Sequence, residues 1–331
     1  FLIQRTLSMA ENLADGAFPP RWMPHAAYDL GYPFFNHYAA LPYYLSGGLT
    51  ALGMNVLTAI QVTQTLGFLL AALAMAQWAR RIYRRPAAQA LAVIAYTFAP
   101  FHLVNVYERG DSLSEFYAFI WYPLILSALD GVIEAPSRRR VLIAALAYGG
   151  LILTHNVSAL IFSPFALLWG LIAIWRHSKL KVPDNDVAPD RARVRRWPAL
   201  ILPFILGVLL TTWFWLPAIV ETKYGQMGDA FTAGYFHYSN HFRGQNLIQP
   251  TWAFDYSVAT DLSDDVSPFS MGLAQAGMTA IGLCLGAVAL LRKDNEAEQR
   301  LLAFALLTCT ILATVMITPL SGFLWQHLPL L

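Results

Sequence analysis

Long runs of hydrophobic residues follow one another along most of the chain, separated by short polar segments. A helix needs about 20 such residues to cross the hydrocarbon core of a bilayer, and eight of the runs approach that length. A transmembrane β-barrel would instead show segments of ~10 residues with alternating polarity. The pattern predicts an all-α polytopic membrane protein with about eight transmembrane helices, at 57–78, 87–106, 115–134, 141–154, 157–175, 198–217, 270–291 and 300–318.

A ninth hydrophobic run, at 39–53, is shorter and rich in Gly, Pro and Tyr. Such a segment is typical of a helix that lies at the membrane interface. The chain begins at Phe1 without a methionine, and we interpret it as a fragment of a longer protein. The predicted organisation is an outer loop with interfacial helices, a six-helix membrane core, a second outer loop, two further membrane helices and the start of an outer segment, at 1–56, 57–217, 218–269, 270–318 and 319–331.

The composition of the chain supports this class and excludes others. Of its 331 residues, 57% are hydrophobic and only 13% are charged, about half the ~25% charged residues of a soluble domain. A soluble enzyme or a disordered chain does not have this balance. The net charge of +2 leaves no basic excess for nucleic acid. The lipid bilayer is therefore the first predicted partner, and nucleic acid is not one.

Most of the basic residues are placed on one side of the membrane by the predicted spans. They follow the first, third, fifth and seventh runs, at 80–85, 138–140, 176–196 and 292–300. Loops rich in Lys and Arg stay in the cytoplasm of membrane proteins. The sequence therefore predicts that residues 1–56 and 218–269 lie outside the cell.

The first candidate for chemistry is the outer segment 16–44, in which Arg21, Asp29 and His37 stand among prolines and aromatic residues. Prolines fix the backbone, and aromatic side chains favour the membrane interface. One interpretation is a loop that only anchors the chain. The other is a ligand site in which Arg21 and Asp29 meet a phosphate or a sugar.

Two short polar turns between predicted spans are the next candidates. Arg109, Asp111 and Glu115 lie between the second and third spans, where charged side chains are costly unless they face a polar cavity. His155 and Asn156 lie between the fourth and fifth spans. The alternative in both places is a capped turn that serves the helices alone.

The second outer loop contributes Glu221, just past a span, and Arg243. His237 and His241 have the spacing of metal ligands on a helix, but no nearby Glu or His pattern completes a site. No metal site is therefore predicted, and a divalent cation is left open.

The order of several motifs resembles bacterial membrane proteins labelled "6-pyruvoyl-tetrahydropterin synthase-related". The residues that carry the resemblance extend over the whole chain: Pro19-Pro20-Arg21-Trp22, Gly31-Tyr32-Pro33, Leu41-Pro42-Tyr43-Tyr44, Arg109-Gly110, Thr154-His155-Asn156, Trp215-Leu216-Pro217 and Leu324-Trp325. A soluble pterin synthase needs a three-histidine zinc site on a β-rich domain, and the sequence supports neither zinc nor pterin. The organisation is similar instead to the GT-C superfamily of integral membrane glycosyltransferases.

That resemblance implies transfer of a sugar from a polyprenyl-phosphate donor at the outer face of a bacterial plasma membrane. It names neither the sugar nor the acceptor. The main catalytic acid of such enzymes would follow a first span that precedes Phe1. The candidates within this chain are Asp29, Asp111, Glu115 and Glu221. The candidate substrate-binding residues are Arg21, Trp22, Tyr32, His37, Tyr38, Arg109, His155, Asn156 and Arg243.

Two other functions are weighed against this enzyme. A non-catalytic protein that binds lipid-linked glycans or assembles the cell envelope would use the same scaffold without the acid. A transporter predicts charged residues in the middle of its spans. The predicted spans here carry their charges at the ends, which disfavours a transporter.

Overall fold

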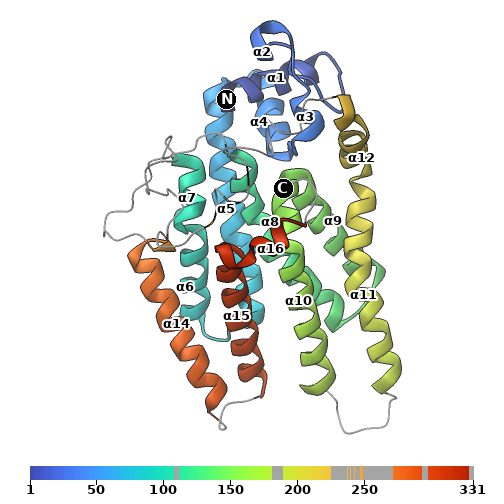
Figure 1. The fold of residues 1–331 in the computed structure, drawn as a ribbon. Coiled ribbons are helices and arrows are strands. Elements are labelled where there is room, and N and C mark those ends of the chain that lie inside the picture. Colours follow the sequence, from blue (N-terminus) through green and yellow to red (C-terminus); the bar gives the residue numbers. More distant parts are fainter. Residues whose placement is uncertain are drawn as a thin grey trace. The chain divides into compact units, whose positions relative to one another are not determined.

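The computed structural model describes residues 1–107, 112–180, 189–224, 237, 239, 242, 247–248, 271–292 and 297–327, with 178–180 and 189–195 described by their backbone alone. The described parts are helical, and their only strand-like pairing consists of isolated bridges between Met23 and Tyr32 and between Ile248 and Met271. The chain divides into two compact units, Phe1–Val220 and Glu221–Leu331. Figure 1 shows the helices of both units.

Six helical segments among the described residues are long and apolar enough to cross a membrane. This confirms the predicted helical class and is consistent with a multi-pass membrane protein. The segment Pro86–Tyr107 consists of two helices with a break at Phe98 and Ala99. The helices concerned are α5 (Val56–Ile82), α6 (Pro86–Thr97) with α7 (Pro100–Tyr107), α8 (Leu113–Glu134), α10 (Asn156–Leu180), α14 (Leu273–Leu291) and α15 (Ala297–Met316).

The sixth predicted span, 198–217, is a bent pair of helices rather than one straight helix. Helices α11 (Pro189–Leu210) and α12 (Thr212–Glu221) meet at an angle of 63°. Thr211 lies at the bend, and its hydroxyl donates to the carbonyls of Gly207 and Val208 at 3.0 Å. The Thr211 hydroxyl thus serves the last carbonyls of α11 at the interruption, and the Val208 carbonyl also accepts from the Thr211 backbone N–H at 3.2 Å. Counted as one span, this pair brings the number of described spans to seven.

The fourth predicted span is a helix, but a short one. Helix α9 (Arg138–Thr154) has 17 residues, which gives a length of ~26 Å beside a hydrocarbon core of ~30 Å. It packs between α8 and α11 in the first unit. Gly149 of α9 and Gly207 of α11 bring the two helices close, because a Cβ at Gly207 would lie 3.2 Å from the Gly149 nitrogen.

The first 56 residues form short helices instead of a span. They are α1 (Leu2–Ala14), α2 (Ala26–Asp29), α3 (Phe34–His37) and α4 (Leu41–Ala51). The predicted interfacial helix at 39–53 corresponds to α4. Helix α1 packs on α4, where the Thr6 and Ser46 hydroxyls lie 3.2 Å apart. Met23 and Tyr32 exchange two backbone hydrogen bonds, of 2.8 and 3.0 Å, and these close the loop that contains α2.

The first unit has two chemically different ends. Helices α1 to α4 cover one end (Figure 1, blue), which we call the α4 end. At the other end Arg81 contacts Glu134, Arg176 contacts Asp130, and Arg140 donates to the Gly131 carbonyl. We call this the arginine end. It holds the basic clusters at 80–85 and 138–140 that follow the first and third predicted spans.

The second unit pairs α14 with α15, and Gly286 of α14 lies under the Leu307 side chain of α15. Two further short elements follow, η5 (Pro319–Ser321) and α16 (Gly322–Trp325). The Trp325 indole nitrogen donates to the Ser321 hydroxyl at 2.9 Å and to the Met316 carbonyl at 3.2 Å. These bonds hold the described end of the chain against the end of α15.

Candidate functional site

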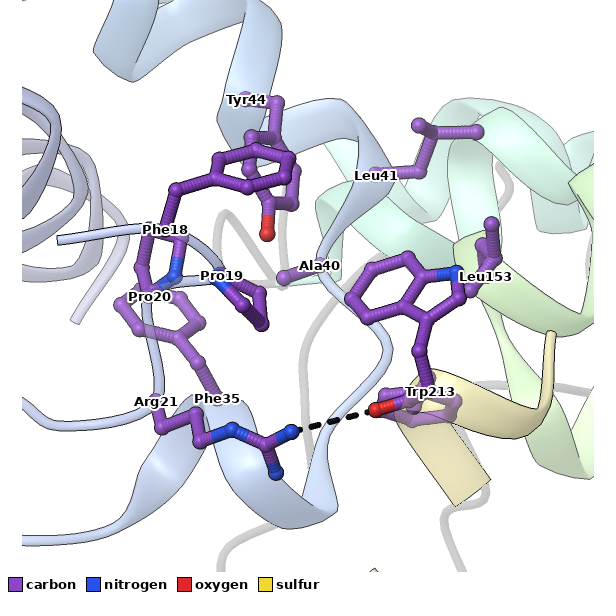
Figure 2. Close-up of a pocket in the computed structure, with 11 residues that line it drawn as sticks. Phe18, Pro19, Pro20, Arg21, Phe35, Ala40, Leu41, Tyr44, Leu153 and Trp213 are labelled. Atoms are coloured by element: carbon purple, nitrogen blue, oxygen red, sulfur yellow. Dashed lines mark hydrogen bonds between the residues drawn. The ribbon is translucent and has the colours of Figure 1, made fainter. Parts of the chain in front are cut away.

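A cavity of about 300 Å³ lies at the α4 end of the first unit (Figure 2). We call it the aromatic cavity. Among the described residues that line it, only Arg21, Tyr44 and Trp213 have a polar group in the side chain. With its apolar walls and one cation, the cavity therefore suits an amphiphilic ligand. It is lined by Phe18, Pro19, Pro20, Arg21, Phe35, Ala40, Leu41, Tyr44, Leu153, Trp213 and Phe214.

Two neutral acceptors hold the Arg21 guanidinium. Its Nη1 donates to Oδ1 of Asn36 at 2.6 Å, and its Nη2 donates to the Trp213 carbonyl at 3.1 Å (Figure 2). Asn36 is buried, with 2% of its surface exposed. A guanidinium has five N–H donors, so these two bonds leave others for a ligand. Because both partners are neutral, they fix the side chain without cancelling its charge.

A proline explains why the Trp213 carbonyl accepts this bond. Within a helix a carbonyl normally accepts from the N–H four residues later. In α12 that residue is Pro217, which has no N–H. The Trp213 carbonyl therefore has no helical donor, and Arg21 supplies one. The local sequence of α12 thus contributes directly to the position of the cation.

Tyr44 adds a hydroxyl to the same cavity. Burial raises the pKa of Tyr44 to about 12, although the nearby Arg21 charge acts in the opposite direction. The phenol consequently keeps its proton at neutral pH. Figure 2 shows its oxygen directed toward the interior of the cavity. A neutral donor and a cation therefore face the same space.

A second polar group lies at the same end, around Tyr38. Ser114 hydrogen-bonds the Tyr38 hydroxyl and donates to the Ala39 carbonyl at 3.0 Å. Burial raises the pKa of Tyr38 well above its ordinary value. The Tyr38 ring stacks on Phe34 at 4.6 Å, and the Arg5 guanidinium lies 4.4 Å over the Phe34 ring.

Glu115 and His155 belong to this group, which we call the Tyr38 cluster. The half-buried Glu115 interacts electrostatically with the hydroxyls of Tyr38 and Tyr122. The His155 ring lies 6.3 Å from the Tyr38 ring, and its Nδ1 lies 2.7 Å from the Ser158 hydroxyl. Three predicted site residues, Tyr38, Glu115 and His155, are therefore brought together from three separate segments.

The aromatic cavity and the Tyr38 cluster are neighbours. The segment 35–41 supplies Phe35, Ala40 and Leu41 to the cavity and Tyr38 to the cluster. The end of α9 supplies Leu153 to the cavity, and His155 follows two residues later. The cavity and the Tyr38 cluster are thus built in part from the same two segments of the chain.

The remaining predicted residues of segment 1–56 have other surroundings. Asp29 is exposed and lies 3.0 Å from Nδ1 of His25. Trp22 is half exposed and packs against Gly31, whose φ of +81° suits a residue without a Cβ. Tyr32 pairs with Met23 through the backbone, and Nε2 of His37 lies 3.4 Å from Nδ2 of Asn36.

Later candidates are more scattered. Asn156 is exposed at the start of α10, and Glu221 is exposed at the end of α12, in the second unit. Arg109, Asp111 and Arg243 lie outside the described residues.

Three residues of the site are absent from the sequence-based candidates. Asn36, Tyr44 and Trp213 contact or face Arg21. Tyr44 belongs to the motif 41–44, and Trp213 stands two residues before the motif 215–217, so these motifs were the available signal. Asn36 has no signal in the sequence, since its role depends on the fold.

No metal centre emerges among the residues that the structure describes, where no group of three or more His, Cys, Asp or Glu side chains is placed to hold an ion. His237 lies 2.7 Å from the Ser239 hydroxyl through its Nδ1. His241, the other half of the predicted pair, lies outside the described residues.

Comparison of the chain with protein-family models, with curated proteins and with solved structures finds no match.

Proposed function

We propose that the protein is an integral membrane glycosyltransferase of the GT-C type, which takes a sugar from a polyprenyl-phosphate donor at the outer face of a bacterial plasma membrane. One observation carries the proposal. The Arg21 guanidinium keeps its charge between two neutral acceptors, in a cavity whose walls are otherwise almost wholly apolar.

The distribution of arginines supports the outer location of this cavity. Basic residues favour the cytoplasmic side, and they cluster at the arginine end of the first unit. The aromatic cavity lies at the opposite, α4 end. A donor at that end would reach the cavity from the outer leaflet, with its isoprenoid chain among the apolar side chains.

The chemistry assigns separate tasks to the two polar groups. Arg21 binds the phosphate and stabilises the charge that develops on it as the bond between the sugar C1 and the phosphate oxygen breaks. The acceptor hydroxyl forms the new bond to C1 and gives its proton to a carboxylate. Polyprenyl phosphate leaves with the electron pair of the broken bond. Within the described residues Glu115, beside Tyr38 and near the cavity, is the carboxylate we propose for this proton.

The test uses the protein in proteoliposomes with a panel of polyprenyl-phosphate-linked hexoses. Release of polyprenyl phosphate reports transfer, and equilibrium binding of polyprenyl phosphate reports affinity. We expect Arg21→Ala to weaken binding by about 10-fold or more, since a charge-assisted bond is worth ~1.5–3 kcal/mol. Arg21→Lys should restore part of it. Arg84→Ala, an exposed arginine at the opposite end, is the matched control. Unchanged binding and transfer in Arg21→Ala would refute the proposal.

A second candidate function is a non-catalytic protein that binds lipid-linked glycans. It is favoured by the fact that the described residues lining the aromatic cavity include no Asp or Glu. Glu115→Gln separates the two. In an enzyme it should lower transfer ~100-fold while binding stays intact. A wild-type protein that binds the donor and never releases polyprenyl phosphate would be a binder.

A further inference from the structure

A larger cavity, of about 600 Å³, lies at the arginine end of the first unit. Helix α8 contributes to it mainly through its second half, and α5 and α9, which both pack on α8, supply its sides. We call it the arginine groove. It is separate from the aromatic cavity, with which it shares no lining residue. Its lining includes Arg81, Leu124, Arg140, Ile143 and Leu146.

Two guanidinium groups meet at one residue of α8. Arg140 Nη1 donates to the Gly131 carbonyl at 2.7 Å. Arg81 approaches the same residue, since Nη2 of Arg81 would lie 3.5 Å from a Cβ built on Gly131. Arg81 also pairs with the half-exposed Glu134 at 3.3 Å. Among the described residues Arg140 has no carboxylate partner, so the mouth of the groove is positive.

The nearest buried acid, Asp130, acts electrostatically on Arg81, and Arg176 is its stronger charged partner. Asp130 is 1% exposed, and its Oδ1 accepts from the Trp169 indole at 3.1 Å and lies 4.0 Å from Arg176. Both of these partners, Trp169 and Arg176, belong to α10. The positive charge of Arg140 remains available to a ligand in the groove.

The rest of the groove is largely apolar and long. Its residues on α8 run from Trp121 to Gly131, a distance of ~15 Å along the helix. Leu124 lies on that stretch, and Ile143 and Leu146 face it from α9. Ile143 is 49% exposed and Leu146 is 54% exposed, as expected of a groove open to lipid.

We propose that the arginine groove binds an anionic phospholipid of the leaflet at the arginine end. Arg81 and Arg140 hold its phosphate, and one acyl chain lies along Leu124, Ile143 and Leu146. Guanidinium groups suit phosphate because their paired donors match its oxygens. Anionic lipids gather in the cytoplasmic leaflet, where basic residues attract them. The site is independent of the proposed glycosyl transfer at the opposite end.

The test is a lipid titration of the purified full chain in detergent, read by native mass spectrometry, with phosphatidylglycerol and phosphatidylcholine as probes. We expect phosphatidylglycerol to bind at least 5-fold more tightly. Arg140→Gln should remove most of this preference. Arg139→Gln makes the same charge change at the neighbouring, exposed position outside the groove and should retain it.

The apolar part of the groove has its own matched pair. Leu146→Gln should weaken phosphatidylglycerol binding several-fold. Leu142→Gln should not, because Leu142 is exposed to a similar degree on the same helix but does not line the groove. Inorganic phosphate distinguishes a lipid site from a site for free phosphate. A site for free phosphate would bind inorganic phosphate at millimolar concentration without any lipid.

Three results would overturn the proposal: equal binding of the two lipids by the wild type, equal losses in Arg139→Gln and Arg140→Gln, or full competition by inorganic phosphate. The melting midpoint without added lipid checks that each variant is folded. If Arg140→Gln does not fold, the lipid preference of the wild type and the Leu146 and Leu142 pair still decide the question.

Discussion

At the scale of single residues, the site depends on how charge and burial are combined around Arg21. Asn36 and the Trp213 carbonyl give the guanidinium a fixed position. Tyr44 lies close enough for the Arg21 charge to act on its pKa, yet burial dominates and keeps the phenol neutral. A ligand phosphate would therefore meet one fixed cation and one neutral hydroxyl.

The raised pKa of Tyr44 predicts a loss of stability in alkali. Unfolded tyrosine loses its proton near pH 10, whereas Tyr44 in the folded protein does so at about 12. Between these values the unfolded state binds fewer protons, so stability falls as pH rises. We expect Tyr44→Phe to reduce the fall in melting midpoint between pH 9 and pH 11 in detergent. Tyr28→Phe, at a fully exposed position, is the control, and identical pH slopes in wild type and Tyr44→Phe would contradict the expectation.

At the scale of helices, prolines connect elements by leaving carbonyls without a helical donor. Pro217 does this for Trp213, which accepts from Arg21. Pro123 does the same in α8, where the Phe119 carbonyl accepts from the Tyr96 hydroxyl at 2.6 Å. In both places a side chain from another segment replaces the missing N–H. Each proline thus adds a specific contact between elements.

Glycines act in the opposite way, by letting helices approach closely. A Cβ at Gly207 would lie 3.0 Å from the Ala145 carbonyl oxygen and 2.8 Å from Cδ1 of Tyr148. We expect Gly207→Ala to separate α9 from α11 and to cost ~1–3 kcal/mol. Gly282→Ala on α14 is the matched control, because a Cβ there meets no described atom within 4 Å. Its effect should be neutral or slightly favourable. Melting midpoints in detergent measure the stability of both variants. A similar fall in Gly207→Ala and Gly282→Ala would show that close packing at Gly207 does not cause the loss of stability.

At the scale of the whole molecule, the membrane-spanning character was predictable because it depends on the hydropathy of contiguous runs. The short helix at 39–53 was predictable for the same reason. The bend at Thr211 was not, since hydropathy alone does not register a break of one residue. The convergence of Tyr38, Glu115 and His155 also depends on contacts between distant segments. No local pattern encodes those contacts.

The two ends of the first unit predict a sidedness that labelling can measure. With Cys284 and Cys309 replaced by alanine, we introduce Leu52→Cys beyond α4 and Ser137→Cys before α9, both at exposed positions. A membrane-impermeant maleimide should label position 52 in intact cells with a permeable outer envelope. Position 137 should react only after the plasma membrane is opened. The reverse pattern would contradict the positive-inside assignment.

The bond between Arg21 and Trp213 joins residues 192 positions apart. A ribosome that feeds this chain into the membrane must therefore deliver α5 to α11 before the second partner of Arg21, the Trp213 carbonyl, emerges. Until then the first 40 residues have only their own contacts and those to the earlier helices. The aromatic cavity is completed late in synthesis, so a chain interrupted before residue 213 carries the motif around Arg21 without its binding site.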